Sequence, residues 1–191
     1  MNPIDELTKL TAMFPQASGQ PLFAAVDYIA ARTTPEPYLS LLNHDHHMTV
    51  TMEQQHGGPV SVQVLTERRI GDVYCRQITL KRTDDGGPNA GRTVQYGLVR
   101  FDLSHVTNAV RDQILSGEIP LGRVLINHNV MRQIDLNAIL RFEVGPALAG
   151  YLDCSEGRTT YGRLATIFCD NRPAVDLLEV ASPLESTDNA H

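Results

Sequence analysis

The sequence contains few cysteines, and their placement suggests neither a disulfide framework nor a metal site. The three residues, Cys75, Cys154 and Cys169, are odd in number, and their separations match no metal-binding spacing. We therefore interpret them as reduced thiols of a cytosolic protein and predict a cytoplasmic location. The N-terminal residues also lack the basic and apolar regions of a secretory signal peptide, in agreement with this prediction.

Long apolar runs and an excess of positive charge are absent as well. No run of apolar residues is long enough to span a membrane, so no membrane partner is predicted. The formal net charge is -6 at pH 7, and because binding to phosphate groups needs a basic surface, no nucleic-acid partner is predicted. Of the 191 residues, 42% are hydrophobic, which is typical of a globular protein with one core. A monomer or a homodimer is expected.

The spacing of apolar residues predicts an α+β fold. Residues 1–45 are expected to be a helical segment of the same domain, because residues 21–31 (PLFAAVDYIAA) carry apolar residues at helical spacing. Residues 46–184 form the main domain, in which short strands joined by tight turns predict a single antiparallel sheet with helices packed on it. The first strand is expected at residues 48–52, where apolar and polar residues alternate. Residues 185–191 are predicted to be a disordered tail.

Ionisable side chains fall within the apolar rows of several predicted strands. A charge on a core face is costly unless it is paired, so these residues need an explanation. One interpretation is an internal ion pair of Arg76 or Arg132 with Glu179. The other is a buried pocket, in which arginine binds a carboxylate and glutamate serves as an acid or base. The rows are Tyr74, Arg76, Ile78 and Leu80; Val175, Leu177 and Glu179; Val130, Arg132, Ile134 and Leu136; and Tyr161, Arg163, Ala165 and Ile167.

Residues 41–50 (LLNHDHHMTV) place three histidines and an aspartate in four positions. A metal ion needs ligands that converge, whereas adjacent side chains diverge in a helix or a strand, so no metal and no cofactor are predicted. We interpret this stretch as a junction that delivers Met48 to the pocket, with histidines at the pocket mouth. Residues 117–122 (GEIPLG) lead into a helical stretch whose free backbone N–H groups would favour a carboxylate.

Six short motifs occur in an order that resembles the chorismate pyruvate-lyase family. Each motif is short, but together they extend over most of the chain, from about Leu41 to Pro183. The motifs are Leu41-Leu42 with Met48-Thr49, Tyr74-x-Arg76, Pro120-Leu121-Gly122, Arg132 in the strand that follows, Gly162-Arg163, and Glu179-x-x-x-Pro183.

The resemblance implies an antiparallel sheet with helical flaps over a buried site, and an enzyme that cleaves chorismate to 4-hydroxybenzoate and pyruvate without metal or cofactor. Arg76 and Glu179 are the catalytic residues that it implies. Arg76 would bind the ring carboxylate, and Glu179 would lie at the ether oxygen that becomes the phenol. The substrate-binding residues that it implies are Met48, Thr49, Leu121, Gly122, Arg132 and Arg163.

The sequence departs from the family's lyases at two places that bear on the substrate. Leu164 follows Arg163 where they usually carry a second arginine, and Val180 begins a short-chain run where bulky apolar residues are usual. A related aromatic acid or enol ether is therefore an open substrate, and a non-catalytic domain that binds or senses an aromatic carboxylate is the alternative function. Effector domains of some bacterial regulators share this sheet, usually with a DNA-binding winged helix, for which about 45 preceding residues are too few.

Overall fold

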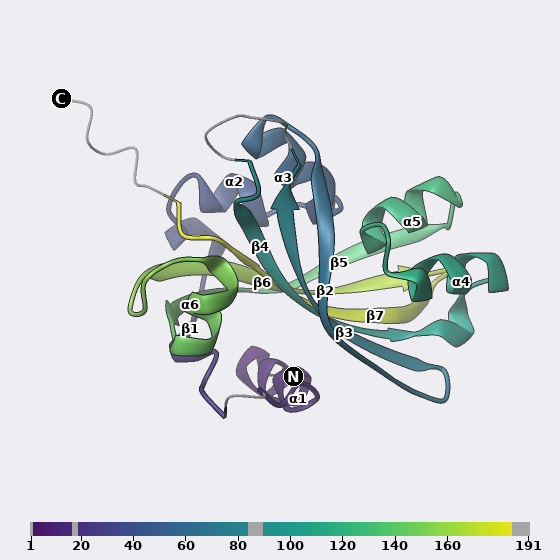
Figure 1. Ribbon diagram of the computed structural model, residues 1–191, viewed down its shortest axis with the longest axis horizontal. Coiled ribbons are helices and arrows are strands. Elements are labelled where there is room, and N and C mark those ends of the chain that lie inside the picture. The colour runs from purple at the N-terminus through teal and green to yellow at the C-terminus, as the bar shows by residue number, and fades with distance from the viewer. Residues whose placement is uncertain (1, 17–18, 84–89, 185–191) are drawn as a thin grey trace.

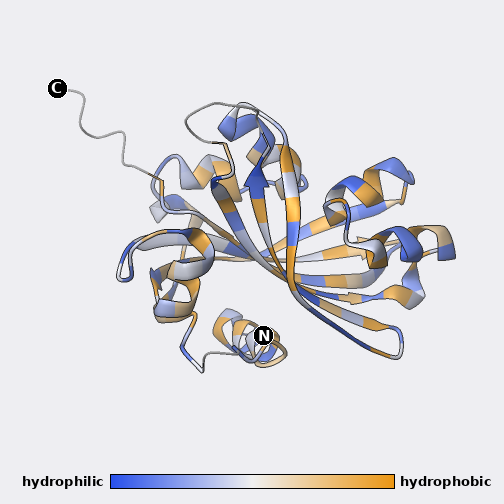
Figure 2. Cartoon of the chain, in the orientation of Figure 1, coloured by the Kyte–Doolittle hydropathy of each residue, from blue (hydrophilic) through white to orange (hydrophobic). Residues whose placement is uncertain are grey.

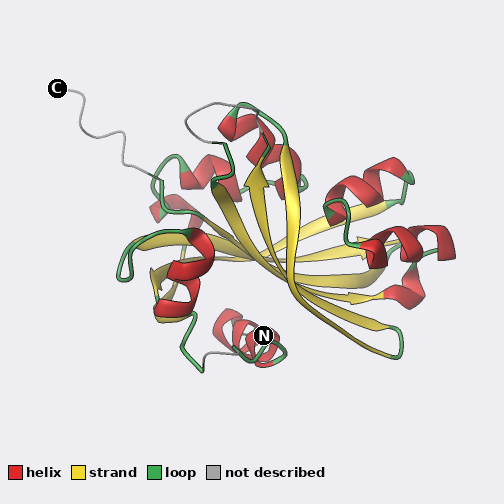
Figure 3. Cartoon of the chain, in the orientation of Figure 1, coloured by secondary structure: helices red, strands yellow, loops and turns green. Residues whose placement is uncertain are grey.

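The described part of the chain folds around one antiparallel sheet of seven strands (Figure 1). The computed structural model describes residues 2–16, 19–83 and 90–184. The strand order is β1-β5-β6-β7-β4-β3-β2, and Figure 3 shows the helices placed around this sheet, which confirms the predicted α+β fold class. The strands are β1 (Phe23–Ile29), β2 (Val60–Ile70), β3 (Val73–Arg82), β4 (Thr93–Asp102), β5 (Arg132–Val144), β6 (Thr159–Cys169) and β7 (Arg172–Ala181).

Helices cover both faces of the sheet. One face packs on α1 and α6 through a single buried core. The other face carries two separate cores, one beneath α2 and α3 and the other beneath α4 and α5. The helices are α1 (Pro3–Ala12), α2 (Tyr38–Leu42), α3 (Met48–His56), α4 (Asn108–Ser116), α5 (Leu121–Asn127) and α6 (Pro146–Leu152), with 3-10 helices η1 (Ala31–Thr33) and η2 (Leu103–His105).

Alternation along the strands accounts for these cores. In β3, Arg76 and Ile78 face α3 and α5, whereas Gln77 points to the opposite face and donates from Nε2 to the Tyr96 hydroxyl over 3.0 Å. Figure 2 shows the same alternation as interleaved hydrophobic and hydrophilic residues along the strands. Successive side chains of a strand point to opposite faces, so both layers of helices receive apolar partners from the same strands.

Two elements differ from the sequence-based expectation. Residues 23–29 form β1 at the edge of the sheet and not a helix, because a bulge between Phe23 and Ala25 interrupts the two-residue alternation and imitates helical spacing. Residues 48–56 form α3 and not a strand. Met48 and Met52 are buried one helical turn apart, and five alternating residues were too few to distinguish the two periods.

The boundaries predicted for the segments stay predictions. The described part of segment 1–45 contains α1, η1 and α2, and β1 pairs with β5 and joins this segment to the sheet. Thr107 caps α4, and its side chain accepts a hydrogen bond from the Val110 N–H. Residues 185–191, predicted to be disordered, lie outside the described residues. None of the described helices is long and apolar enough to cross a membrane.

Candidate functional site

A small cavity lies on the sheet between the two groups of helices, where the cores beneath them meet. Its volume is about 40 Å³. Strands β3, β4 and β7 form its floor, and the first residues of α3 and α5 form its roof, which agrees with the helical flaps expected over a buried pocket. The predicted site residues that line it are Met48, Thr49, Arg76, Leu121, Gly122 and Glu179.

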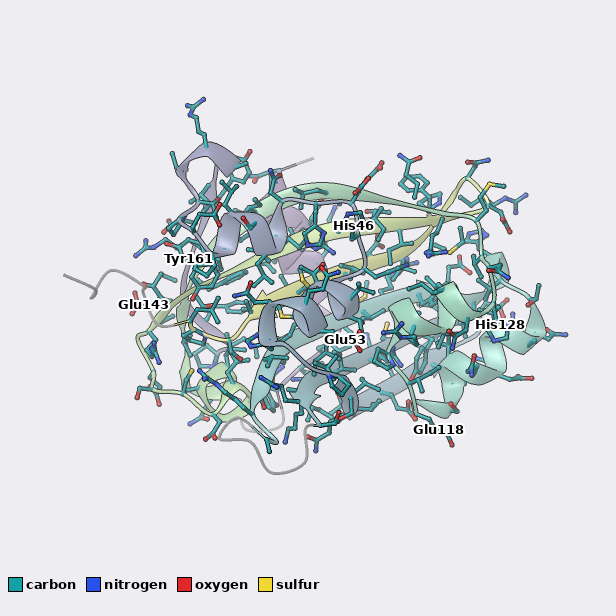
Figure 4. The ribbon with its side chains drawn as sticks, turned by 90° about the horizontal axis from the view of Figure 1, so that it is seen from above. His46, Glu53, Glu118, His128, Glu143 and Tyr161 are labelled. Atoms are coloured by element: carbon teal, nitrogen blue, oxygen red, sulfur yellow. The ribbon has the colours of Figure 1, made fainter. Side chains whose placement is uncertain are left out.

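An ion pair joins the two helices of the roof. Glu53 of α3, labelled in Figure 4, accepts a hydrogen bond at Oε2 from Arg123 Nη2 of α5 over 2.6 Å. Both side chains are partly exposed, and pairs of this kind contribute about 0–1 kcal/mol to stability. The roof is therefore closed by a weak contact that can be exchanged for water.

Arg76 is a buried cation at the floor of the cavity. It is 2% exposed, and its Nε and Nη1 atoms have no hydrogen-bond partner. None of the salt bridges among the described residues includes Arg76. Burial lowers the pKa of the Arg76 guanidinium, and Tyr74 and Glu67 only partly oppose this. Because arginine does not lose its proton in proteins, the cavity contains a positive charge that the described carboxylates leave largely uncompensated.

Arg163 is buried too, but its donors are all engaged. Its Nε donates to Glu179 Oε2 over 2.7 Å, and Nη1 and Nη2 donate to the carbonyl oxygens of His44 and His46 over 2.8 and 3.0 Å. Arg163 therefore ties β6 and β7 to the loop that leads into α3. The predicted pairing of Glu179 with Arg76 or Arg132 is wrong, because the hairpin of β6 and β7 places Arg163 directly opposite Glu179.

Arg132 lies outside the cavity and supports its roof. Its Nε donates to His47 Nε2 over 2.6 Å, and both side chains border an open cleft next to the cavity. Burial lowers the pKa of His47 to about 4, and the positive charges of Arg132 and Arg163 add to this effect. His47 is therefore neutral, with the acceptor at Nε2 and the proton at Nδ1. Neither Arg132 nor Arg163, both predicted to bind substrate, lines the cavity.

The other histidines of the LLNHDHHMTV stretch shape the loop. His44 donates from Nε2 to the Leu41 carbonyl over 2.7 Å, and its ring stacks on His46 with the centroids 5.7 Å apart. Burial, followed by the charge of Arg163, lowers the pKa of His44. Of the three histidines, His47 reaches the cavity wall. The described residues contain no group of three or more His, Cys, Asp or Glu side chains that could hold a metal ion, and the absence of a metal or cofactor stays a prediction.

Sequence reasoning missed one polar residue of the cavity wall. Gln95 of β4 is 3% exposed, and its Oε1 atom is buried without a hydrogen-bond partner. It lies in the row of Gly97, Val99 and Phe101, so the rule that singled out Arg76 in an apolar row would have found it. Gly97 also lines the floor, and the Ile78 side chain packs over it, 3.2 Å from where a Cβ of residue 97 would lie.

Replacing Gly122 by alanine is expected to destabilise the protein by about 1–3 kcal/mol, the usual cost of overpacking. A Cβ atom at this position would lie 2.9 Å from Cβ and Cγ of His47, so α5 would have to move away from α3. Gly150→Ala in α6 is the matched control, because no atom lies within 4 Å of its added Cβ. Helix propensity predicts that this control gains up to about 1 kcal/mol. Equal shifts of both variants in urea denaturation would contradict a close contact at Gly122.

Solved structures with this fold include the effector domain of PhnF from Mycobacterium smegmatis. It matches with a TM-score of 0.51 and 11% sequence identity, over 72% of this chain and 88% of its own. The two share a fold. The structure of PhnF from the same organism matches with a TM-score of 0.50 and 10% identity, over 71% of this chain and 63% of its own.

A third structure is the ligand-binding domain of a Bordetella bronchiseptica protein assigned to the GntR family of transcriptional regulators. It matches with a TM-score of 0.45 and 15% identity, over 69% of this chain and 88% of its own. No protein-family model matches the sequence, and no curated protein matches it either. At these identities the structural matches show the fold alone.

These matches correct the prediction of a chorismate pyruvate-lyase-like enzyme. The matches with a TM-score of 0.50 or more are an effector domain and the protein that contains it, and neither is a lyase. Of what the resemblance to the lyase family implies, the α+β fold is supported, whereas the cleavage of chorismate is not. The site agrees with this correction, because Glu179, the expected acid, forms an ion pair with Arg163. The predicted absence of a nucleic-acid partner stays a prediction.

Proposed function

We propose that this protein is a non-catalytic domain that binds or senses a small molecule, and that Arg76 binds an anionic group of its ligand. The observation that carries the proposal is the buried guanidinium with Nε and Nη1 unpartnered at the cavity. Native proteins leave few buried polar groups without a partner, and exceptions often mark function. A carboxylate would accept charge-assisted hydrogen bonds from this guanidinium, whose donors suit an anionic partner.

The roof would complete the anion site. The N–H groups of Met48 and Thr49, in the first turn of α3, have no partner within the helix and carry its positive partial charge. The side chain of Met48, with Ile78 and Leu121, supplies apolar wall for the body of the ligand. Gly122 allows α5 to close on His47. In this proposal Arg132 and Arg163 act indirectly, since they hold His47 and the preceding loop in place.

The size of the cavity supports sensing. A dry cavity of about 150 Å³ binds benzene in a known case, whereas this one has about 40 Å³. An aromatic carboxylate would therefore enter only if the roof moves outward, and the Glu53–Arg123 contact is weak enough to allow this. A ligand that binds an open form more tightly shifts the population toward that form, and this shift is the output of a sensor.

Isothermal titration calorimetry with benzoate, acetate and inorganic phosphate tests the proposal, with benzamide as the uncharged analogue of benzoate. We expect at least one anion to bind the wild type, and benzamide to bind at least 10-fold more weakly than benzoate if benzoate is that anion, because charge-assisted hydrogen bonds are about twice as strong as neutral ones. Arg76→Met is expected to abolish the binding of the anion. An equal affinity of Arg76→Met and the wild type, or no binding of any anion, would overturn the proposal.

A further inference from the structure

We infer that Gln95 forms a second polar subsite of the same cavity, so that the ligand is a hydroxylated carboxylate with its anionic group at Arg76 and a hydroxyl at Gln95. The inference rests on the proposed function. Its own observation is the buried, unpartnered Oε1 of Gln95, an atom independent of the Arg76 guanidinium and lining the same cavity. A primary amide both donates and accepts hydrogen bonds, and a hydroxyl is the small group that matches both.

The register of the sheet gives the distance between the two subsites. Arg76 lies opposite Val99, and Leu80 lies opposite Gln95, so the two polar side chains are four residues apart along the same pair of strands. Four residues of antiparallel strand correspond to about 13 Å between the backbone positions. Gly97 lies between them and presents no side chain. The ligand would therefore extend along β3 and β4, with its apolar body above Gly97 and Ile78.

The neighbouring glutamine of β3 shows how a buried glutamine in this fold is otherwise satisfied. Gln77 is 2% exposed on the opposite face. Its Oε1 accepts from the Thr66 hydroxyl over 3.1 Å, and its Nε2 donates to the Tyr96 hydroxyl over 3.0 Å. Gln95 is as deeply buried, yet its Oε1 has no such partner. A ligand in the cavity would supply the hydrogen-bond donor that Gln95 Oε1 lacks.

The test compares ligand pairs that differ by one hydroxyl, namely benzoate with 3- and 4-hydroxybenzoate, and phenylacetate with 4-hydroxyphenylacetate. Each probe is titrated into the wild type, Gln95→Met and the matched control Gln77→Met. We expect the wild type to prefer a hydroxylated probe about 5-fold or more, because an unsubstituted probe leaves the buried Oε1 atom of Gln95 without a partner, which is penalised by at least that factor. Gln95→Met should lose this preference and bind the unsubstituted probe within about 2-fold of the wild type.

The control separates ligand recognition from stability. Gln77→Met leaves the hydroxyls of Thr66 and Tyr96 without their partner, so it should lower the midpoint of thermal unfolding and keep the preference for the hydroxyl. Gln95→Met removes an unpartnered atom and should unfold at the wild-type temperature or above. A lower unfolding temperature for Gln95→Met than for Gln77→Met would make Gln95 a structural residue and overturn the inference.

The remaining outcomes distinguish the two proposals. If an unsubstituted carboxylate binds through Arg76 but no hydroxylated probe shows a preference that depends on Gln95, the inference fails and the proposed function stands. Ordered water would then be the partner of Gln95. If neither these probes nor the smaller anions bind the wild type, the proposed function fails, and the inference fails with it.

Discussion

Replacing Arg163 by methionine is expected to lower the free energy of unfolding by about 3–5 kcal/mol, because it leaves a buried carboxylate without its counter-charge. Arg163 is 1% exposed, and its partner Glu179 is mostly buried, with the Nε and Oε2 atoms 2.7 Å apart. The substitution also removes the donors to the carbonyl oxygens of His44 and His46, so the loop before α3 loses its attachment to the sheet. Guanidinium denaturation, followed by circular dichroism, measures the change.

Arg100→Met is the matched control for this prediction. Arg100 also lies opposite a carboxylate on the adjacent strand, and its Nη1 is 3.1 Å from Asp176 Oδ2. Both side chains of this pair are partly exposed, so its loss should cost about 0–1 kcal/mol. If the two variants were destabilised equally, burial would not be the reason for the importance of the Arg163–Glu179 pair.

Replacing Arg76 by methionine is expected to do the opposite and stabilise the unliganded protein by about 1–4 kcal/mol. The substitution keeps an unbranched side chain of similar length in the cavity wall and removes a charge that no salt bridge among the described residues compensates. For a chain of this size the midpoint of thermal unfolding should rise by roughly 2–4 °C for each kcal/mol. The same variant should no longer bind an anionic ligand, because the charge and the fork of donors are gone.

Arg76→Lys controls for charge alone. It keeps the positive charge, so we expect wild-type stability within about 1 kcal/mol, but it presents a point charge in place of a planar fork, so anion binding should weaken. Differential scanning fluorimetry with and without benzoate measures both effects. A loss of stability in Arg76→Met as large as that in Arg163→Met would identify Arg76 as a structural cation and contradict the proposed anion site.

Arg76 and Arg163 look alike in the sequence, since each interrupts an apolar row of a strand. Their difference lies in what is opposite to them. Arg76 faces Val99, whereas Arg163 faces Glu179 across the β6–β7 hairpin. Counting from the two-residue turn at Asp170 and Asn171 would place Arg163 opposite Leu178, and the register shift between Ile167 and Phe168 brings Glu179 opposite it instead. No local pattern could have shown that the backbone of His44 and His46 completes the coordination of Arg163.

The sequence alone determined the α+β class, most strands, and the rows that bring Arg76 and Glu179 to the face of the cavity. These features depend on a two-residue period that every strand imposes on its own side chains, so distant residues do not alter them. The sequence-based prediction failed at β1 and α3. A bulge in β1 imitates helical spacing, and the alternating residues at the start of α3 are too few to separate the two periods.

Only the tertiary structure decided which charges are paired and which groups enclose the cavity. Arg132 donates a hydrogen bond to His47, and Arg163 pairs with Glu179 and with the loop before α3. Gln95 lines the cavity beside Gly97. The physical reason is that pairing depends on distances between segments far apart in the chain. Burial makes the pairing energetically important, because an unpartnered charge or amide costs little free energy in water and much in a buried cavity.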